Sequence, residues 1–166
     1  MENPQLTQLV RIIKIIGGAL IMGVVIFAIV TFLIADWGKA NAEFSPIGLA
    51  GLAFAVAACA ASFYVPGVIF KQAAQQFAAA NPKPEVQSLL QASGQAVTTS
   101  TIVRLALNEG GAFMALLVWM ISGNIFGLVG AFFCLAAMIL KFPTSERVEQ
   151  QFADFRQELK QQQRGT

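Results

Sequence analysis

The sequence IVRLALNEGGAFMALLVWMI, residues 102–121, is the stretch from which the rest of the chain can be interpreted. Its length matches the roughly 20 apolar residues that a helix needs to cross a bilayer. One acidic residue, Glu109, lies well inside it. An ionised carboxylate is costly in hydrocarbon, so Glu109 must be paired, hydrogen-bonded or protonated. This stretch therefore predicts a transmembrane helix that carries one polar site.

Three more runs of similar character lie at about 15–35, 47–70 and 125–140. Hydrophobic residues make up 56% of the chain and charged residues only 12%, about half the charged share of a soluble domain. Short connections between the runs leave no room for a second core. We therefore predict an all-α membrane protein, a single domain over residues 1–166, with four transmembrane helices.

Two helical segments are predicted outside the spans. Residues 71–101 form a cytoplasmic extension, interrupted by NPKP at 81–84, which either holds a partner or ligand or is a solvated helical hairpin. Gly94 and the threonine-rich 98–101 are expected to loosen the helix before the third span. Residues 145–163 form an amphipathic helix. Its apolar stripe lies in the membrane interface, packs on 71–100, or binds a partner; the stripe residues are Val148, Phe152, Phe155 and Leu159.

Local signals place several helix ends and contacts. Ser45 followed by Pro46 is typical of a helix start, and Gly123 suits a helix end. Small residues recur at four-residue spacing in the second and fourth spans, which allows helix backbones to approach closely. The predicted seams are Gly51/Ala55, Ala53/Ala57/Ala61, Gly123/Gly127/Ala131 and Gly130/Cys134.

The distribution of Lys and Arg predicts the orientation. Nine lie in the N-terminal segment, the 71–101 segment and the C-terminal segment, against only Lys39 between the first two spans. The positive-inside rule then places both termini in the cytoplasm, in a membrane that we expect to be the bacterial inner membrane. Ala40-Asn41-Ala42 is similar to a signal-peptide cleavage site, but the first apolar run exceeds the usual 7–15 residues, so we do not expect cleavage.

Composition also excludes several kinds of chemistry. The chain has no histidine, which argues against histidine-bound metals, haem and Ser-His-Asp or Cys-His catalysis. Cys59 and Cys134 lie in apolar runs and are expected to be small buried hydrophobes. No basic patch indicates nucleic-acid binding. We therefore expect no metal, no cofactor and no enzymatic activity.

Depth counting along the spans gathers a candidate site around Glu109. Tyr64 is expected at a similar level, Arg104 lies between Glu109 and the inner edge, and Asn108 offers two donors from another helix face. One interpretation is structural, with a neutral Glu109 bonded to Tyr64 or an ion pair with Arg104. The other is a proton or cation site, because an intramembrane acid is a functional hypothesis by default.

Two resemblances accompany this reading. Residues 98–120, TTSTIVRLALNEGGAFMALLVWM, resemble the carboxylate-bearing helix of rotary ATP synthase proteolipids, which implies that Glu109 carries an ion. RLALNEGGAF, SGN and the KFPT of 141–144 resemble a group of small uncharacterised bacterial four-helix membrane proteins, which implies the topology alone.

The leading functional hypothesis is a non-enzymatic structural or accessory membrane subunit. It would pack with itself, in a homo-oligomer, or with other subunits of a larger membrane complex. The alternative is a protein that translocates protons or cations through Glu109.

Overall fold

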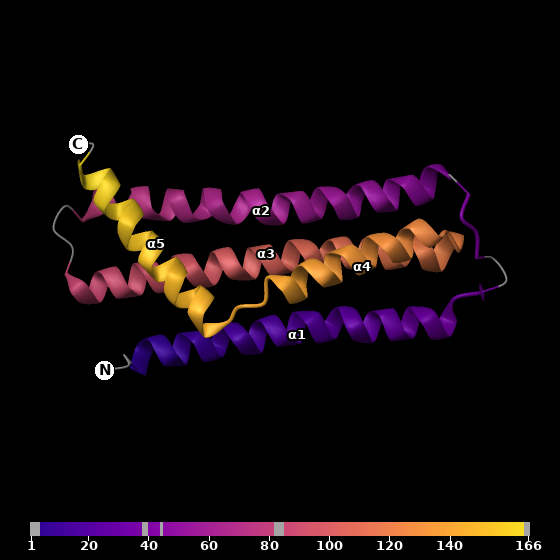
Figure 1. The fold of residues 1–166 in the computed structure, drawn as a ribbon, viewed down its shortest axis with the longest axis horizontal. Helices are drawn as coiled ribbons and strands as arrows, with labels where there is room; N and C mark the ends of the chain where they lie inside the picture. The colour runs from indigo at the N-terminus through magenta and orange to yellow at the C-terminus, as the bar shows by residue number, and fades with distance from the viewer. Residues whose placement is uncertain (1–3, 38–39, 44, 82–84, 165–166) are drawn as a thin grey trace. The chain divides into compact units, whose positions relative to one another are not determined.

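The computed structural model of the protein describes residues 4–37, 40–43, 45–81 and 85–164. They form α1 (Pro4–Ile34), α2 (Pro46–Ala80), α3 (Val86–Ser122), α4 (Ile125–Leu140) and α5 (Ser145–Arg164) (Figure 1). α1, α2 and α3 are each long and apolar enough to cross a membrane, and a fourth span results if α4 and α5 are counted as one broken span. The predicted all-α membrane class is confirmed at this level.

The helix ends follow the local signals in the sequence. α2 begins at Pro46, and the Gly48 N–H donates to Ser45 Oγ at 3.2 Å. α3 is followed by Gly123, whose φ of 66° lies in the left-handed region that glycine adopts without strain. Asn124 caps α4, because its Oδ1 accepts from the Phe126 N–H at 3.0 Å. The starts and stops predicted at Ser45, Pro46 and Gly123 are confirmed.

α3 is one continuous helix, which corrects the expectation that Gly94 and residues 98–101 loosen it. The hydroxyls of Ser93 and Ser100 donate to the carbonyls of Leu90 and Val97, each at 3.0 Å, so these residues stay within the helix. Gly94 is buried, and a Cβ there would lie 3.7 Å from the Leu9 side chain. Tertiary packing thus outweighs the low helix propensity of glycine and threonine.

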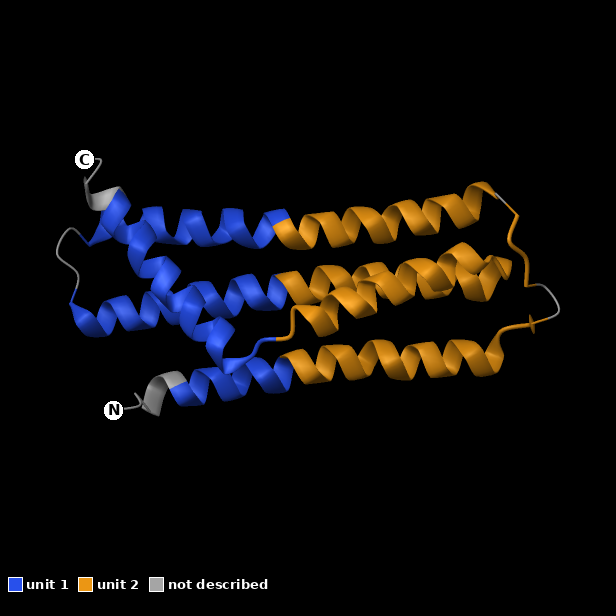
Figure 2. Ribbon diagram, in the orientation of Figure 1, with its two compact units in different colours: residues 1–16, 64–103, 143–166 blue, residues 17–63, 104–142 orange. Residues whose placement is uncertain are grey.

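The chain divides into two compact units (Figure 2). Unit 1 comprises residues 1–16, 64–103 and 143–166, and unit 2 comprises residues 17–63 and 104–142. α1, α2 and α3 each continue from one unit into the other, whereas α4 belongs to unit 2 and α5 to unit 1. Each unit combines several separate segments of the chain, so the two units are not two domains that follow one another in the sequence. The single domain expected over residues 1–166 stays a prediction.

The interior of unit 2 is built from small residues. A Cβ at Gly111 would lie 2.8 Å from Ala58 Cβ and 2.9 Å from Cys134 Sγ, and one at Gly127 would lie 2.5 Å from the Ala115 carbonyl oxygen. These helices therefore meet nearly backbone to backbone. Of the predicted seams, Gly51/Ala55, Gly123/Gly127/Ala131 and Gly130/Cys134 are buried, whereas Ala53 and Ala57 are exposed.

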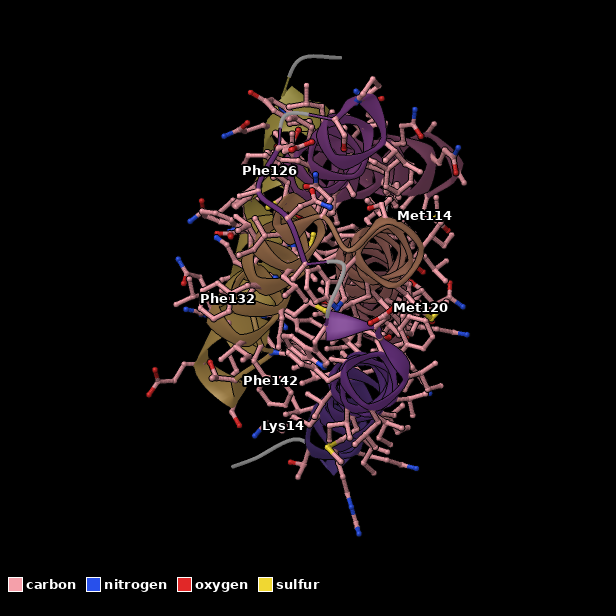
Figure 3. The ribbon with its side chains drawn as sticks, turned by 90° about the vertical axis from the view of Figure 1, so that its right-hand side faces the viewer. Lys14, Met114, Met120, Phe126, Phe132 and Phe142 are labelled. Atoms are coloured by element: carbon pink, nitrogen blue, oxygen red, sulfur yellow. The ribbon has the colours of Figure 1, made fainter. Side chains whose placement is uncertain are left out.

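Large apolar side chains cover the outside of unit 2. Met114 and Phe132 point away from α3 and α4 (Figure 3), and Phe132 is 71% exposed. Such a distribution, small inside and large outside, is expected where the surroundings are lipid and not water. The most exposed of these side chains are Met22, Ile26, Ile29, Leu33, Ile34, Trp37, Phe54, Val56, Phe63, Ile121, Phe132, Phe133, Ile139 and Leu140.

A polar clasp, Asn41 with Asn124, ties two loops of unit 2 together. Asn124 is fully buried, and its Nδ2 lies 3.1 Å from Asn41 Oδ1, 2.8 Å from the Glu43 carbonyl and 3.0 Å from Ser45 Oγ. The backbone of Asn41 pairs with both neighbours of Asn124, since its N–H donates to the Gly123 carbonyl and its carbonyl accepts from the Ile125 N–H, each at 3.0 Å. The clasp satisfies backbone groups that the helix ends leave free.

Two adjacent glycines provide a matched test of this packing. Gly111→Ala should lower the free energy of unfolding by about 1–3 kcal/mol, because its Cβ has no space between α2 and α4. Gly110→Ala should leave stability unchanged or raise it by up to about 1 kcal/mol, since nothing lies within 4 Å of that Cβ position and alanine favours a helix. Unfolding of both variants in mixed detergent micelles measures the difference in stability. Equal stabilities would contradict the close packing of α2 and α4 at Gly111.

Candidate functional site

Glu109 lies where α3 contacts α1 within unit 2. Its Oε1 is 3.3 Å from the position that a Cβ would occupy at Gly23, so the glycine leaves room for the carboxyl group. Four residues further along each helix, the rings of Phe27 and Phe113 pack edge to face with centroids 5.0 Å apart. α1 and α3 therefore run in parallel at this contact, with Gly23 and Glu109 at the same height.

Glu109 is half-buried and lacks a polar partner of its own. Among the described residues it has no hydrogen bond and no ion pair. The carboxyl group is thus covered on one side by α1 and open on the other. Within an apolar unit, such a group has to be neutral or find a partner from outside the chain.

Asn108 and Arg104 lie beside Glu109 on α3, in different directions. Asn108 is fully buried, its Nδ2 donates to the Arg104 carbonyl at 3.0 Å, and its Oδ1 is buried without a hydrogen-bond partner among the described residues. Successive residues of a helix point about 100° apart, so Asn108 faces away from the α1 contact. Arg104 is half-buried. The structure thus places all three predicted residues within two turns of unit 2, with separate surroundings.

Tyr64, the fourth predicted site residue, belongs to unit 1, and its side chain is 77% exposed. Since Glu109 has no hydrogen bond or ion pair among the described residues, the structure contains neither the expected hydrogen bond to Tyr64 nor the expected ion pair with Arg104. Sequence reasoning missed Gly23, the residue that Glu109 contacts. The signal was present, because Gly23 lies eight residues into the first predicted span and Glu109 lies seven residues into the third.

The apolar stripe of α5 lies in the interior of unit 1. Phe155 is fully buried, and its ring packs edge to face on Phe70 of α2 with centroids 5.3 Å apart. Of the three surroundings considered for the stripe, the structure shows packing on the 71–100 hairpin and on the first turns of α1. Val148 and Phe152 share a core with Val10, Ile13 and Val97, and Phe155 and Leu159 share one with Ala74 and Ala96.

A groove of about 460 Å³ lies between α2 and α3 in unit 1. Its walls include the polar side chains Gln72, Gln76, Gln95 and Thr99 together with Phe77, and no lining residue is charged. The groove falls in the 71–101 segment that was predicted to hold a partner or ligand or to be a solvated hairpin. A surface of amides and alanines favours neither an acidic nor a basic ligand.

Metal-ligating groups do not cluster in the described part of the chain: no three His, Cys, Asp or Glu residues there could hold a metal ion. Cys59 and Cys134 are free thiols, half-buried and buried respectively. Comparison with protein-family models, curated proteins and solved structures finds no match. A functional proposal therefore rests on the side chains themselves, and Glu109 is the most distinctive of them.

The packing of α5 can be tested by amide hydrogen exchange in detergent micelles or nanodiscs. Backbone amides of 146–160 should be protected in the wild type. Phe155→Ala removes a fully buried ring, so it should cost about 3–5 kcal/mol and expose these amides. Arg156→Ala, a change at an exposed neighbour, should leave protection unchanged. Wild-type exchange at the rate of a free peptide would contradict the observed core.

Proposed function

We propose that this chain is a non-enzymatic integral membrane protein, a structural or accessory subunit that packs with itself or within a larger membrane complex. The observation that carries the proposal is the composition of unit 2, with glycine and alanine inside and large apolar side chains outside. In lipid, helices associate by close packing of small residues, and the outer side chains face the acyl chains.

The length of unit 2 supports its placement in the bilayer. Its helical segments are 17–34, 46–63, 104–122 and 125–140. At 1.5 Å per residue they extend roughly 24–29 Å, close to the roughly 30 Å of a hydrocarbon core. α4 then acts as the fourth span although it has only 16 residues. Unit 1 forms the helical extension outside the membrane.

The orientation follows from charge. The segments before the first span, between the second and third, and after the fourth carry nine Lys and Arg, and the loop between the first two spans carries one. We therefore place both termini and unit 1 on the cytoplasmic side, and the Asn41–Asn124 clasp on the other side, of a bacterial inner membrane.

A second candidate function is proton or cation translocation through Glu109. It is favoured by the position of the carboxyl group, half-buried in the α1–α3 contact with no hydrogen bond or ion pair among the described residues. A carboxyl group in that setting can take up and release a proton or a cation. The resemblance to proteolipid helices points the same way. The helices of unit 2 pack closely at Gly111 and Gly127. This packing favours the accessory role, because an ion path would need open space between the helices.

Topology is tested with single cysteines at Ala42 and Gly165 in a chain from which Cys59 and Cys134 have been removed. In intact cells, an impermeant thiol reagent should label the cysteine at position 42 and not the one at 165, because the charge bias places only the first outside. After lysis both should react. Labelling at 165 with protection at 42 in intact cells would show that the orientation is the reverse of the one proposed.

The two candidate functions are separated by one variant, Glu109→Gln, which keeps the shape of the side chain and loses its ability to exchange a proton. For an accessory subunit, wild type and variant should migrate with equal size on native gels of solubilised membranes, and neither should carry protons or Na⁺ into liposomes. For an ion carrier, the wild type should conduct, and both the variant and treatment with a hydrophobic carbodiimide should abolish the flux.

A further inference from the structure

Glu109 is the only acidic residue in the helical segments 17–34, 46–63, 104–122 and 125–140 of unit 2, and Arg104, at the first position of the third segment, is the only basic one. Its carboxyl group contacts Gly23 on one side and is open on the other. A hydrogen-bonding group that faces lipid in this way is unsatisfied in the isolated chain, because acyl chains offer neither donor nor acceptor. The partner has to come from another molecule at the same depth.

The surface around Glu109 differs from the rest of the exterior of unit 2. On α3 the exposed residues next to it, Ala106 and Gly110, are small. On α1 the exposed Ala19, one turn before Gly23, is also small, whereas Met22 and Ile26 beside Gly23 are large. Nothing in the chain lies within 4 Å of the Cβ position at Gly110. We call Ala19, Gly23, Ala106, Glu109 and Gly110 the acid face. Small residues beside a polar group are the features that allow two membrane helices to approach and hydrogen bond.

We propose that the acid face is the contact between two copies of this chain, and that their two Glu109 carboxyl groups hydrogen bond to each other. The inference rests on the proposed membrane function and specifies its partner as a second copy. Two copies inserted with the same orientation carry Glu109 at the same depth, so a two-fold axis along the membrane normal brings the two groups together.

Carboxyl chemistry supports a second copy as the partner. A protonated carboxyl group has one donor and retains acceptor capacity, so two of them satisfy each other. Arg104, the one basic residue of these segments, lies five residues before Glu109 and about 140° around α3, so it is not at the same depth or on the same face. Gly110 and Ala106 leave the space that the approaching helix requires. Each chain alone has an incomplete site, and the pair completes it.

The test measures self-association of the purified full-length protein in lipid nanodiscs or micelles by energy transfer between donor- and acceptor-labelled copies. Glu109→Leu should raise the dissociation constant by about tenfold, equivalent to about 1.4 kcal/mol. Glu109→Gln should retain association within about threefold, because a carboxamide is also both donor and acceptor. Thermal unfolding of each variant confirms that the monomer is intact.

Two glycines give a steric test with a matched control. Gly110→Leu should raise the dissociation constant by at least about tenfold, because the side chain projects into the contact and meets nothing in its own chain. Gly18→Leu makes the same change at another position with no atom within 4 Å, about 140° around α1 from Gly23, and should have no effect.

Three outcomes would overturn the proposal. The wild type could be monomeric, Gly110→Leu and Gly18→Leu could have equal effects, or Glu109→Gln could dissociate the pair as fully as Glu109→Leu. The last result would show that the pair needs an ionised carboxylate facing a basic group of the second copy, and not a hydrogen bond between two carboxyl groups. If the cysteine at position 42 is labelled and the one at 165 is protected while association is absent, the pairing fails and the membrane function stands. If the spans themselves fail, both fall together.

Discussion

The contact of α3 with α4 through Gly127 is the interaction on which unit 2 depends. A Cβ at this position would lie 2.5 Å from the Ala115 carbonyl oxygen and 2.8 Å from the Trp119 nitrogen, so the two backbones touch with no side chain between them. The tight turn at Gly123 brings these helices together, and Gly111 continues the contact toward α2. In lipid there is little hydrophobic gain from association, and close packing of this kind is what remains.

The polar groups of unit 2 are treated in two different ways. At Asn124 the buried amide is surrounded by acceptors and a donor, and the Asn41–Asn124 clasp leaves little hydrogen-bonding capacity unused. At Glu109 the chain supplies space, through Gly23, and no partner. Local rules are broken in natural proteins mostly where function requires it. This contrast within one unit is the physical reason for proposing Glu109 as the contact with a second copy.

The fold could be predicted from the sequence to a large extent, because apolar run length and capping residues are local signals. α4 has the bounds expected, and α2 begins at Pro46 as Ser45 indicated. The continuity of α3 through Gly94 could not be predicted, since it depends on packing against Leu9, far away in the chain. The Asn41–Asn124 clasp was missed for the same reason.

The candidate site was predicted only in part. Arg104, Asn108 and Glu109 lie on one helix, so their spacing in the sequence is enough to predict that they are neighbours and that their side chains point in different directions. The contact with Gly23 depends on which helix lies beside α3, which hydropathy alone does not determine. The apolar stripe of α5 could be recognised from its helical period. What the stripe packs against could not be predicted, because a membrane interface, a partner protein and a core within the chain all require the same apolar face.

The construction of unit 1 has a consequence for biogenesis. Its two hydrophobic cores combine α1 residues such as Val10, hairpin residues such as Val97 and α5 residues such as Phe155. These come from segments far apart in the sequence, so the unit closes only after α5 has been synthesised. In the four-span arrangement, a missed insertion separates these segments across the membrane and leaves their apolar faces in water, where chaperones and proteases recognise them. In that arrangement, folding of unit 1 requires that every span has been inserted.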